Sequence, residues 1–106
     1  MTGEENSRST DVKLAQHAIH DKLESRINTA EAKLKTLKAR AQTAKANVEL
    51  KAITKLLTRK QTIAKKLKDL KKSGGDRFEQ VRADIEARIT DLEKSVKGIK
   101  SKVNSN

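Results

Sequence analysis

The strongest constraint on the fold is the lack of residues that break a helix. After Gly3, no glycine or proline occurs before Gly74. These two residue types most disfavour a helix interior. The only strong turn signal is Ser73-Gly74-Gly75-Asp76, where a glycine can end one helix in the left-handed conformation and Asp76 can cap the next. The pattern predicts an all-α protein built as a long antiparallel helical hairpin or coiled coil, with its turn at residues 73–75.

Apolar residues recur at heptad spacing on both sides of this turn, which is typical of helices that pack through a narrow seam. After the turn, the stripe consists of Phe78, Ile85, Leu92 and Ile99, with Ile89, Val96 and Val103 beside them. Before the turn, one stripe comprises Leu23, Ile27, Ala30, Leu34, Leu37, Ala41, Ala44 and Val48. A second comprises Ile53, Leu56, Ile63, Leu67 and Leu70, with Lys60 at a seam position. We assign these apolar positions to helix-seam packing.

The heptad phase slips between Val48 and Ile53, and this slip permits two architectures. In one, a continuous helix over about residues 11–72 changes its partner face near residue 50. In the other, the chain turns near Asn47 and forms a three-helix bundle. We favour the continuous helix because residues 45–57 contain no strong helix breaker. One helical domain is then expected over residues 10–103, with a second helix at about 76–103, a disordered polar tail at 1–9 and a frayed end at 104–106.

A continuous first helix has a consequence for assembly. It would be on the order of 90 Å long at 1.5 Å per residue, and the last helix could cover only its second half. The stripe from Leu23 to Val48 would lie exposed, which soluble proteins rarely tolerate. We therefore expect a homo-oligomer or a bound protein partner on this architecture, and no such need on the three-helix architecture.

The composition argues against several classes of function. The chain has one Phe and no Cys, Trp or Tyr, so thiolate chemistry and Cys-based zinc sites are excluded. A thin helix seam offers no desolvated pocket for acid–base catalysis, so we expect no enzyme, no cofactor and no small-molecule substrate. No apolar run is long enough to span a membrane. A role at an anionic membrane surface is also disfavoured, because interfacial aromatic anchors are nearly absent. With no secretory signal at the N-terminus, we expect a cytoplasmic protein.

The net charge of +11 is concentrated in residues 33–72, where fourteen cations face only Glu49 and Asp69. We call this segment the basic block. Clustered cations bind phosphate polymers by releasing counterions, and without aromatic residues such binding would not read base sequence. The alternative, which we favour, is that the block serves solubility and pairs with acidic residues of the last helix. The candidate residues for nucleic acid or another anionic partner are Lys33, Lys35, Lys38, Arg40, Lys45, Lys51, Lys55, Arg59, Lys60, Lys65, Lys66 and Lys68.

His17, His20, Asp21 and Glu24 share one face of the first helix, and two histidines at this spacing can chelate a metal. All the ligands would come from a single helix, and such clusters are common on exposed faces without a metal. We therefore predict no metal site here.

Together these observations favour a non-catalytic structural or adaptor protein that binds helical or acidic protein partners. The alternative is sequence-independent nucleic-acid binding through the basic block, and the third possibility is peripheral binding to anionic membranes.

Overall fold

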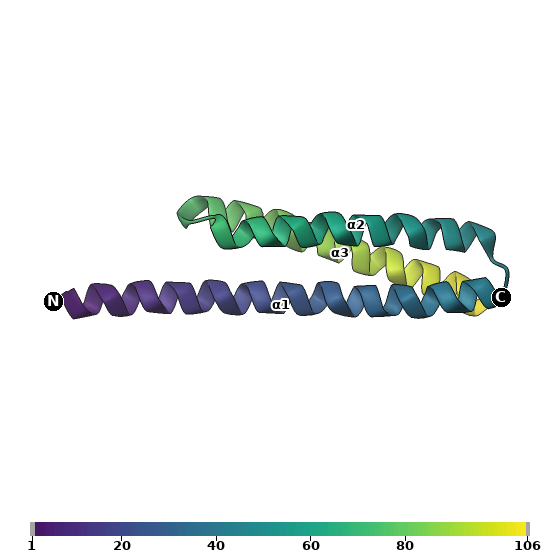
Figure 1. The fold of residues 1–106 in the computed structure, drawn as a ribbon, viewed down its shortest axis with the longest axis horizontal. Coiled ribbons are helices and arrows are strands. Elements are labelled where there is room, and N and C mark those ends of the chain that lie inside the picture. Colours follow the sequence, from purple (N-terminus) through teal and green to yellow (C-terminus); the bar gives the residue numbers. More distant parts are fainter. Residues whose placement is uncertain (1, 106) are drawn as a thin grey trace.

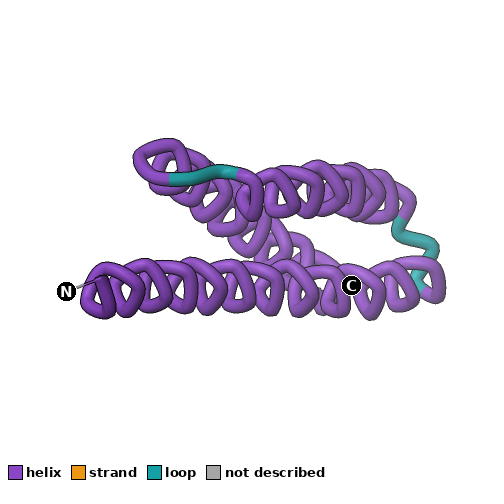
Figure 2. The backbone as a smooth tube through the Cα atoms, turned by 60° about the vertical axis from the view of Figure 1, so that its left-hand side comes forward, coloured by secondary structure: helices purple, strands orange, loops and turns teal. Residues whose placement is uncertain are grey.

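The computed structural model describes the backbone of residues 2–105 and the side chains of residues 15–104. The described chain forms three helices, α1 (Thr2–Thr43), α2 (Asn47–Lys72) and α3 (Gly75–Ser105). Every pair of helices is in contact, and the molecule is a narrow rod of 66 × 17 × 16 Å (Figure 1). The two connections lie at opposite ends of α2, so successive helices run antiparallel (Figure 2). The predicted all-α fold is confirmed.

The favoured continuous helix is wrong, and the alternative three-helix bundle is the observed architecture. The chain turns just after Thr43, where Lys45 has a left-handed φ of 55°. The Ala46 amide donates to the Ala41 carbonyl at 2.9 Å and the Lys45 amide to the Gln42 carbonyl at 3.2 Å. These two bonds form a Schellman motif, the usual ending of a helix at glycine, here with lysine in the left-handed position.

Burial of the apolar stripes explains why the helix ends without a breaker. A left-handed non-glycine residue costs roughly 1–2 kcal/mol. Folding α1 back against α2 and α3 buries Leu23, Ile27, Leu34 and Leu37 to 4% exposure or less. Each such side chain contributes about 1.5–3 kcal/mol on full burial, so the gain outweighs the strain at Lys45 several times over.

The core runs the length of the bundle as one cluster with contributions from all three helices. Its larger members are Leu23, Ile27, Leu34 and Leu37 of α1, Ile53, Leu56, Ile63, Leu67 and Leu70 of α2, and Phe78, Ile85, Ile89, Leu92, Val96, Ile99 and Val103 of α3. Val48, which the sequence places in the seam, is instead 77% exposed, because the chain has already turned before it. Among the side chains of residues 15–104 it is the one large hydrophobic residue left exposed.

This closed core changes the expectation about assembly. The stripe from Leu23 to Ala41 is covered by α2 and α3 of the same chain. Within residues 15–104, the stripe from which a homo-oligomer or an apolar helical partner is expected is therefore not exposed in this architecture.

The outer helices reach both ends of the described backbone. The backbone is helical from Thr2, where the sequence predicts a disordered tail over residues 1–9, and helical to Ser105 at the other end. Once a helix is nucleated, each added residue gains one hydrogen bond, and residues 2–10 contain no proline to stop that propagation. As a result, α1 extends beyond the turn between α2 and α3 (Figure 1).

The Schellman ending makes a test of the turn possible. We expect Lys45→Gly to be more stable than Lys45→Ala by about 1 kcal/mol, because glycine adopts the left-handed conformation without a Cβ clash. Both variants remove the same charge, so the comparison isolates the backbone. Urea unfolding followed by circular dichroism measures the difference. In a continuous helix the order would reverse, with glycine less stable than alanine by about 1 kcal/mol.

Candidate functional site

The positive charge of the protein is unevenly divided among its helices. α2 carries nine cations and only two carboxylates, Glu49 and Asp69. α3 is close to neutral, with seven cations and six carboxylates. The sequence predicts that the carboxylates of α3 pair with the cations of α2. The observed partners of these carboxylates therefore determine which cations of α2 remain available to bind an anion.

Most carboxylates of α3 that form ion pairs do so with arginines of α3 itself. Arg82 donates to Glu79 at 2.6 Å and to Glu86 at 3.0 Å, and these bonds raise the pKa of its guanidinium. Arg88 donates to Asp84 at 3.0 Å, and this hydrogen bond is the main reason that the pKa of Asp84 is lowered. These i,i+3 and i,i+4 pairs are the common neighbours on a helix surface, so they form without any other helix.

A further carboxylate of α3 is taken by α1. Arg26 of α1 donates to Glu93 at 2.6 Å, and this hydrogen bond lowers the pKa of the Glu93 carboxyl. Within the described side chains, the one ion pair that joins α2 to α3 is Lys66 with Asp84 at 3.5 Å. The expected neutralisation of α2 by α3 is therefore realised at a single pair.

Between α1 and α2, Glu31 acts as the acceptor for two cations. It accepts from Lys60 of α2 and, at 2.9 Å, from Lys35 of its own helix. The hydrogen bond from Lys60, followed by that from Lys35, lowers the pKa of Glu31 to about 2. This pair also explains how a lysine occupies a seam position of α2, since the stem of Lys60 packs at the interface while its ammonium reaches Glu31.

The Glu31 carboxylate predicts a component of the acid dependence of stability. Because its folded pKa lies below the unfolded value, its contribution is present above about pH 4.5 and is lost as the pH falls toward 2. We expect the urea midpoint of the wild type to fall more between pH 6 and pH 2.5 than that of Glu31→Gln. Asp84 and Glu93 remain in both proteins and titrate in the same direction, so the difference between the two reports Glu31. Equal acid sensitivity would contradict the assignment.

Seven cations of α2 are exposed and have no ion pair within residues 15–104. We call them the unpaired α2 cations: Lys51, Lys55, Arg59, Lys65, Lys68, Lys71 and Lys72. Lys51, Lys65 and Lys72 are separated by multiples of seven, which places them in one line on the side of α2 away from the buried stripe. Lys55 lies next to this line. The structure thus brings together a row of cations that form no ion pair with a described side chain, and Asp69, between Lys65 and Lys72, is the carboxylate on the same side of α2.

Some of the remaining residues of the basic block form ion pairs or hydrogen bonds, and others do not. Lys35, Lys60 and Lys66 form the ion pairs described above, and Arg40 donates to the Asn104 side chain at 3.1 Å. Lys33 helps to lower the pKa of Glu93, whereas Lys38 and Lys45 are exposed and have no ion pair with a described side chain.

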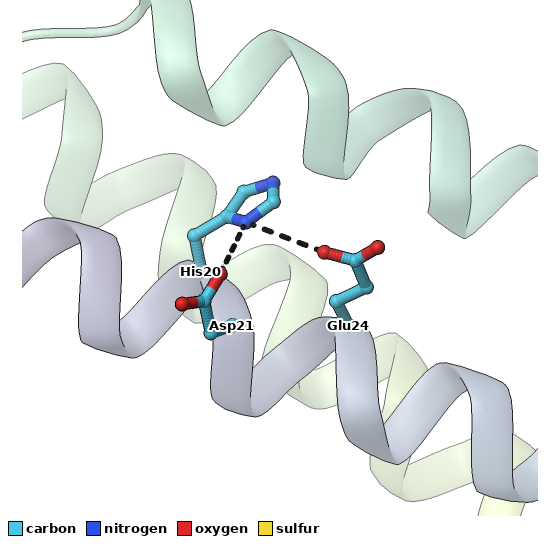
Figure 3. Close-up of side chains that lie close together, drawn as sticks. All are labelled: His20, Asp21 and Glu24. Atoms are coloured by element: carbon cyan, nitrogen blue, oxygen red, sulfur yellow. Dashed lines mark ion pairs between the residues drawn. The ribbon is translucent and has the colours of Figure 1, made fainter.

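The two histidines of the α1 cluster lie in different environments. His17 is exposed, but His20 is 6% exposed and lies near Leu70 and Phe78, at the end of the bundle where α2 turns into α3. Its Nδ1 atom is 3.6 Å from Asp21 Oδ1 and 3.7 Å from Glu24 Oε2 (Figure 3). The signal that could have found His20 is its heptad position, because it lies seven residues before the buried Ile27 and fourteen before the buried Leu34, whereas His17 lies outside this line.

Comparison with protein-family models, curated proteins and solved structures found no match to this chain. Within residues 2–105, no helix is both long enough and apolar enough to cross a membrane.

Proposed function

We propose that the protein binds the phosphate backbone of nucleic acids, without reading base sequence, through the unpaired α2 cations. The observation that supports this proposal is the excess of cations on α2, nine against two carboxylates. Most of the paired carboxylates of α3 bind Arg82, Arg88 and Arg26 and therefore do not neutralise α2. Fixed cations on a rigid helix attract a polyanion and release its condensed counterions.

The dimensions of the row suit a polymer more than a small anion. From Lys51 to Lys72 the helix advances about 32 Å, at 1.5 Å per residue. A duplex carries one phosphate charge per roughly 1.7 Å of its axis, so many phosphates lie within reach of such a row. A single small anion could contact only one or two of these cations.

The chemistry of the row supports contact with the backbone rather than with bases. Six of the seven unpaired α2 cations are lysines, which lack the planar fork that reads guanine. The single Phe of the chain, Phe78, is 4% exposed and therefore cannot stack on a base. The role that we propose is one of binding and includes no catalytic step.

The experiment compares two variants that lose the same charge from different helices. Lys51, Lys65 and Lys72 are changed to Gln in the α2 variant, and Lys94, Lys97 and Lys100 in the α3 variant. All six are exposed and without ion pairs in the described part of the chain. Fluorescence anisotropy with a mixed-sequence duplex at about 50 mM salt should show the α2 variant at least tenfold weaker than the wild type, because three of about four phosphate contacts are lost. The α3 variant should bind nearly as the wild type. Equal losses in both would overturn the proposal.

An acidic protein partner, as part of a structural or adaptor role, is the second candidate. The lack of exposed aromatic side chains is as compatible with an acidic protein as with the phosphate backbone of nucleic acids, because both ligands can be recognised by charge alone. Polyglutamate of matched length distinguishes the two as a competitor of the duplex. Tighter binding of polyglutamate than of DNA at the same salt would place the acidic protein first.

A further inference from the structure

A second unusual feature of the molecule is the buried histidine of α1, His20, which plays no part in the proposed anion binding. His20 is 6% exposed, and its Nδ1 atom is buried without a hydrogen-bond partner among the described residues. The nearest carboxylate oxygens, at 3.6 and 3.7 Å, are too distant for hydrogen bonds. Burial of a polar atom without a hydrogen-bond partner costs free energy, so a ligand that contacts Nδ1 would stabilise the folded protein.

The groups around this nitrogen are those of a metal site. The Nδ1 atom of His20, a carboxylate oxygen of Asp21 and one of Glu24 lie within 4.8 Å of one another. Figure 3 shows both carboxylates directed toward the imidazole from the same helix. Bonds of about 2.0–2.2 Å to an ion in tetrahedral geometry place ligand atoms roughly 3.3–3.6 Å apart. The two distances from His20 Nδ1 are within a few tenths of an ångström of that spacing.

We propose that His20, Asp21 and Glu24 bind a divalent transition-metal ion such as Zn²⁺, with water completing the coordination. One imidazole nitrogen and two carboxylates suit zinc and its first-row neighbours, whereas Mg²⁺ and Ca²⁺ prefer oxygen ligands alone. An ion between the three groups would supply the missing partner of Nδ1 and balance the two carboxylates.

The surrounding charges are compatible with a cation at this position. From α2, Lys60, Lys68 and Lys71 line the groove beside His20 and Glu24, and these ammonium groups oppose a further positive charge. Lys60 is already paired with Glu31, and Lys68 and Lys71 are exposed, so their charges are screened by solvent. The contribution of α3 to the hollow beside His20 is the neutral ring of Phe78.

The ion would also explain the position of the cluster in the fold. His20 and Glu24 are four residues apart, so a metal that binds both side chains would bridge one turn of α1. That turn lies beside the end of α2 and the start of α3, since His20 lines a hollow with Leu70 and Phe78, and α1 extends further, past the α2–α3 connection (Figure 1). Binding to the folded state should therefore raise thermal stability, with the logarithm of the ratio of free ion concentration to Kd.

The test is calorimetric titration of the full, metal-free chain with ZnCl₂, alongside thermal unfolding with and without the ion. We expect one ion per chain and a higher midpoint of unfolding. Glu24→Gln, at an exposed position that leaves the core intact, should weaken binding at least tenfold, and His20→Gln should do the same. His17→Gln is the matched control and should bind Zn²⁺ as the wild type.

Three outcomes would overturn the site. They are the absence of saturable Zn²⁺ binding, unchanged binding in Glu24→Gln, and a loss in His17→Gln that equals or exceeds the loss in His20→Gln. The last result would place the ion between His17 and Asp21, whose nearest atoms are 4.0 Å apart. None of these outcomes decides nucleic-acid binding, because Lys51, Lys65 and Lys72 lie on the side of α2 away from the buried stripe and do not line the groove beside His20.

Discussion

Leu34→Asp is expected to unfold the protein. Leu34 is fully buried in the part of α1 that packs within the bundle. Truncating a buried leucine costs about 2–5 kcal/mol, and burying a carboxylate adds several more. The sum approaches or exceeds the roughly 5–15 kcal/mol by which a domain is usually stable. Circular dichroism should show a large loss of helical signal at 25 °C.

Val48→Asp is the matched control, because Val48 continues the heptad line of Leu34 in the sequence. In the three-helix bundle Val48 lies beyond the turn and is 77% exposed. A substitution at such a surface position changes stability by about 0.5 kcal/mol or less. A continuous first helix would instead make both positions part of one seam, and both variants would then be severely destabilised. Destabilisation by Val48→Asp comparable to that by Leu34→Asp would contradict the observed turn.

The affinity for duplex DNA is expected to fall on the order of 100-fold between 50 and 200 mM salt. Lys51, Lys55, Lys65 and Lys72 share the outward side of α2, so about four phosphates are contacted at once. Each neutralised phosphate contributes about −0.9 to the slope of log affinity against log salt, and four give a slope near −3.6. Fluorescence anisotropy over a salt series measures this slope. A slope near zero would mean that the unpaired α2 cations do not contact phosphate.

The helical class and the apolar core positions could be read from the sequence, because heptad spacing directly reflects which side of a helix faces its neighbours. The turn after Thr43 could not be read in the same way. A Schellman ending is normally signalled by glycine or asparagine, and here Lys45 occupies that position. The phase slip between Val48 and Ile53 was the available signal, and it indicates a change of face without stating whether the helix ends.

The number of charges could be predicted from the sequence, but their ion pairs could not. The excess of cations in residues 33–72 is a property of composition. Their lack of partners depends on geometry, since Arg82 and Arg88 take the carboxylates of α3 that might have faced α2. The burial of His20 likewise depends on where α2 turns into α3. The heptad spacing of α1 places His20 in the buried line of Ile27 and Leu34, but it does not show that Leu70 and Phe78 lie beside the imidazole.

The central claim is that the unpaired α2 cations, and not the net charge of +11 as a whole, contact the polyanion. Affinity at one salt concentration responds to charge anywhere on the protein, whereas the salt slope counts the phosphates actually contacted. The most direct measurement is therefore the salt slope of duplex binding for the α2 and α3 triple Lys→Gln variants. We predict that the slope of the α2 variant is shallower than that of the wild type by about 3, roughly one for each lysine removed, and that the slope of the α3 variant is unchanged. An unchanged slope in the α2 variant, or equal reductions in both variants, would contradict the account.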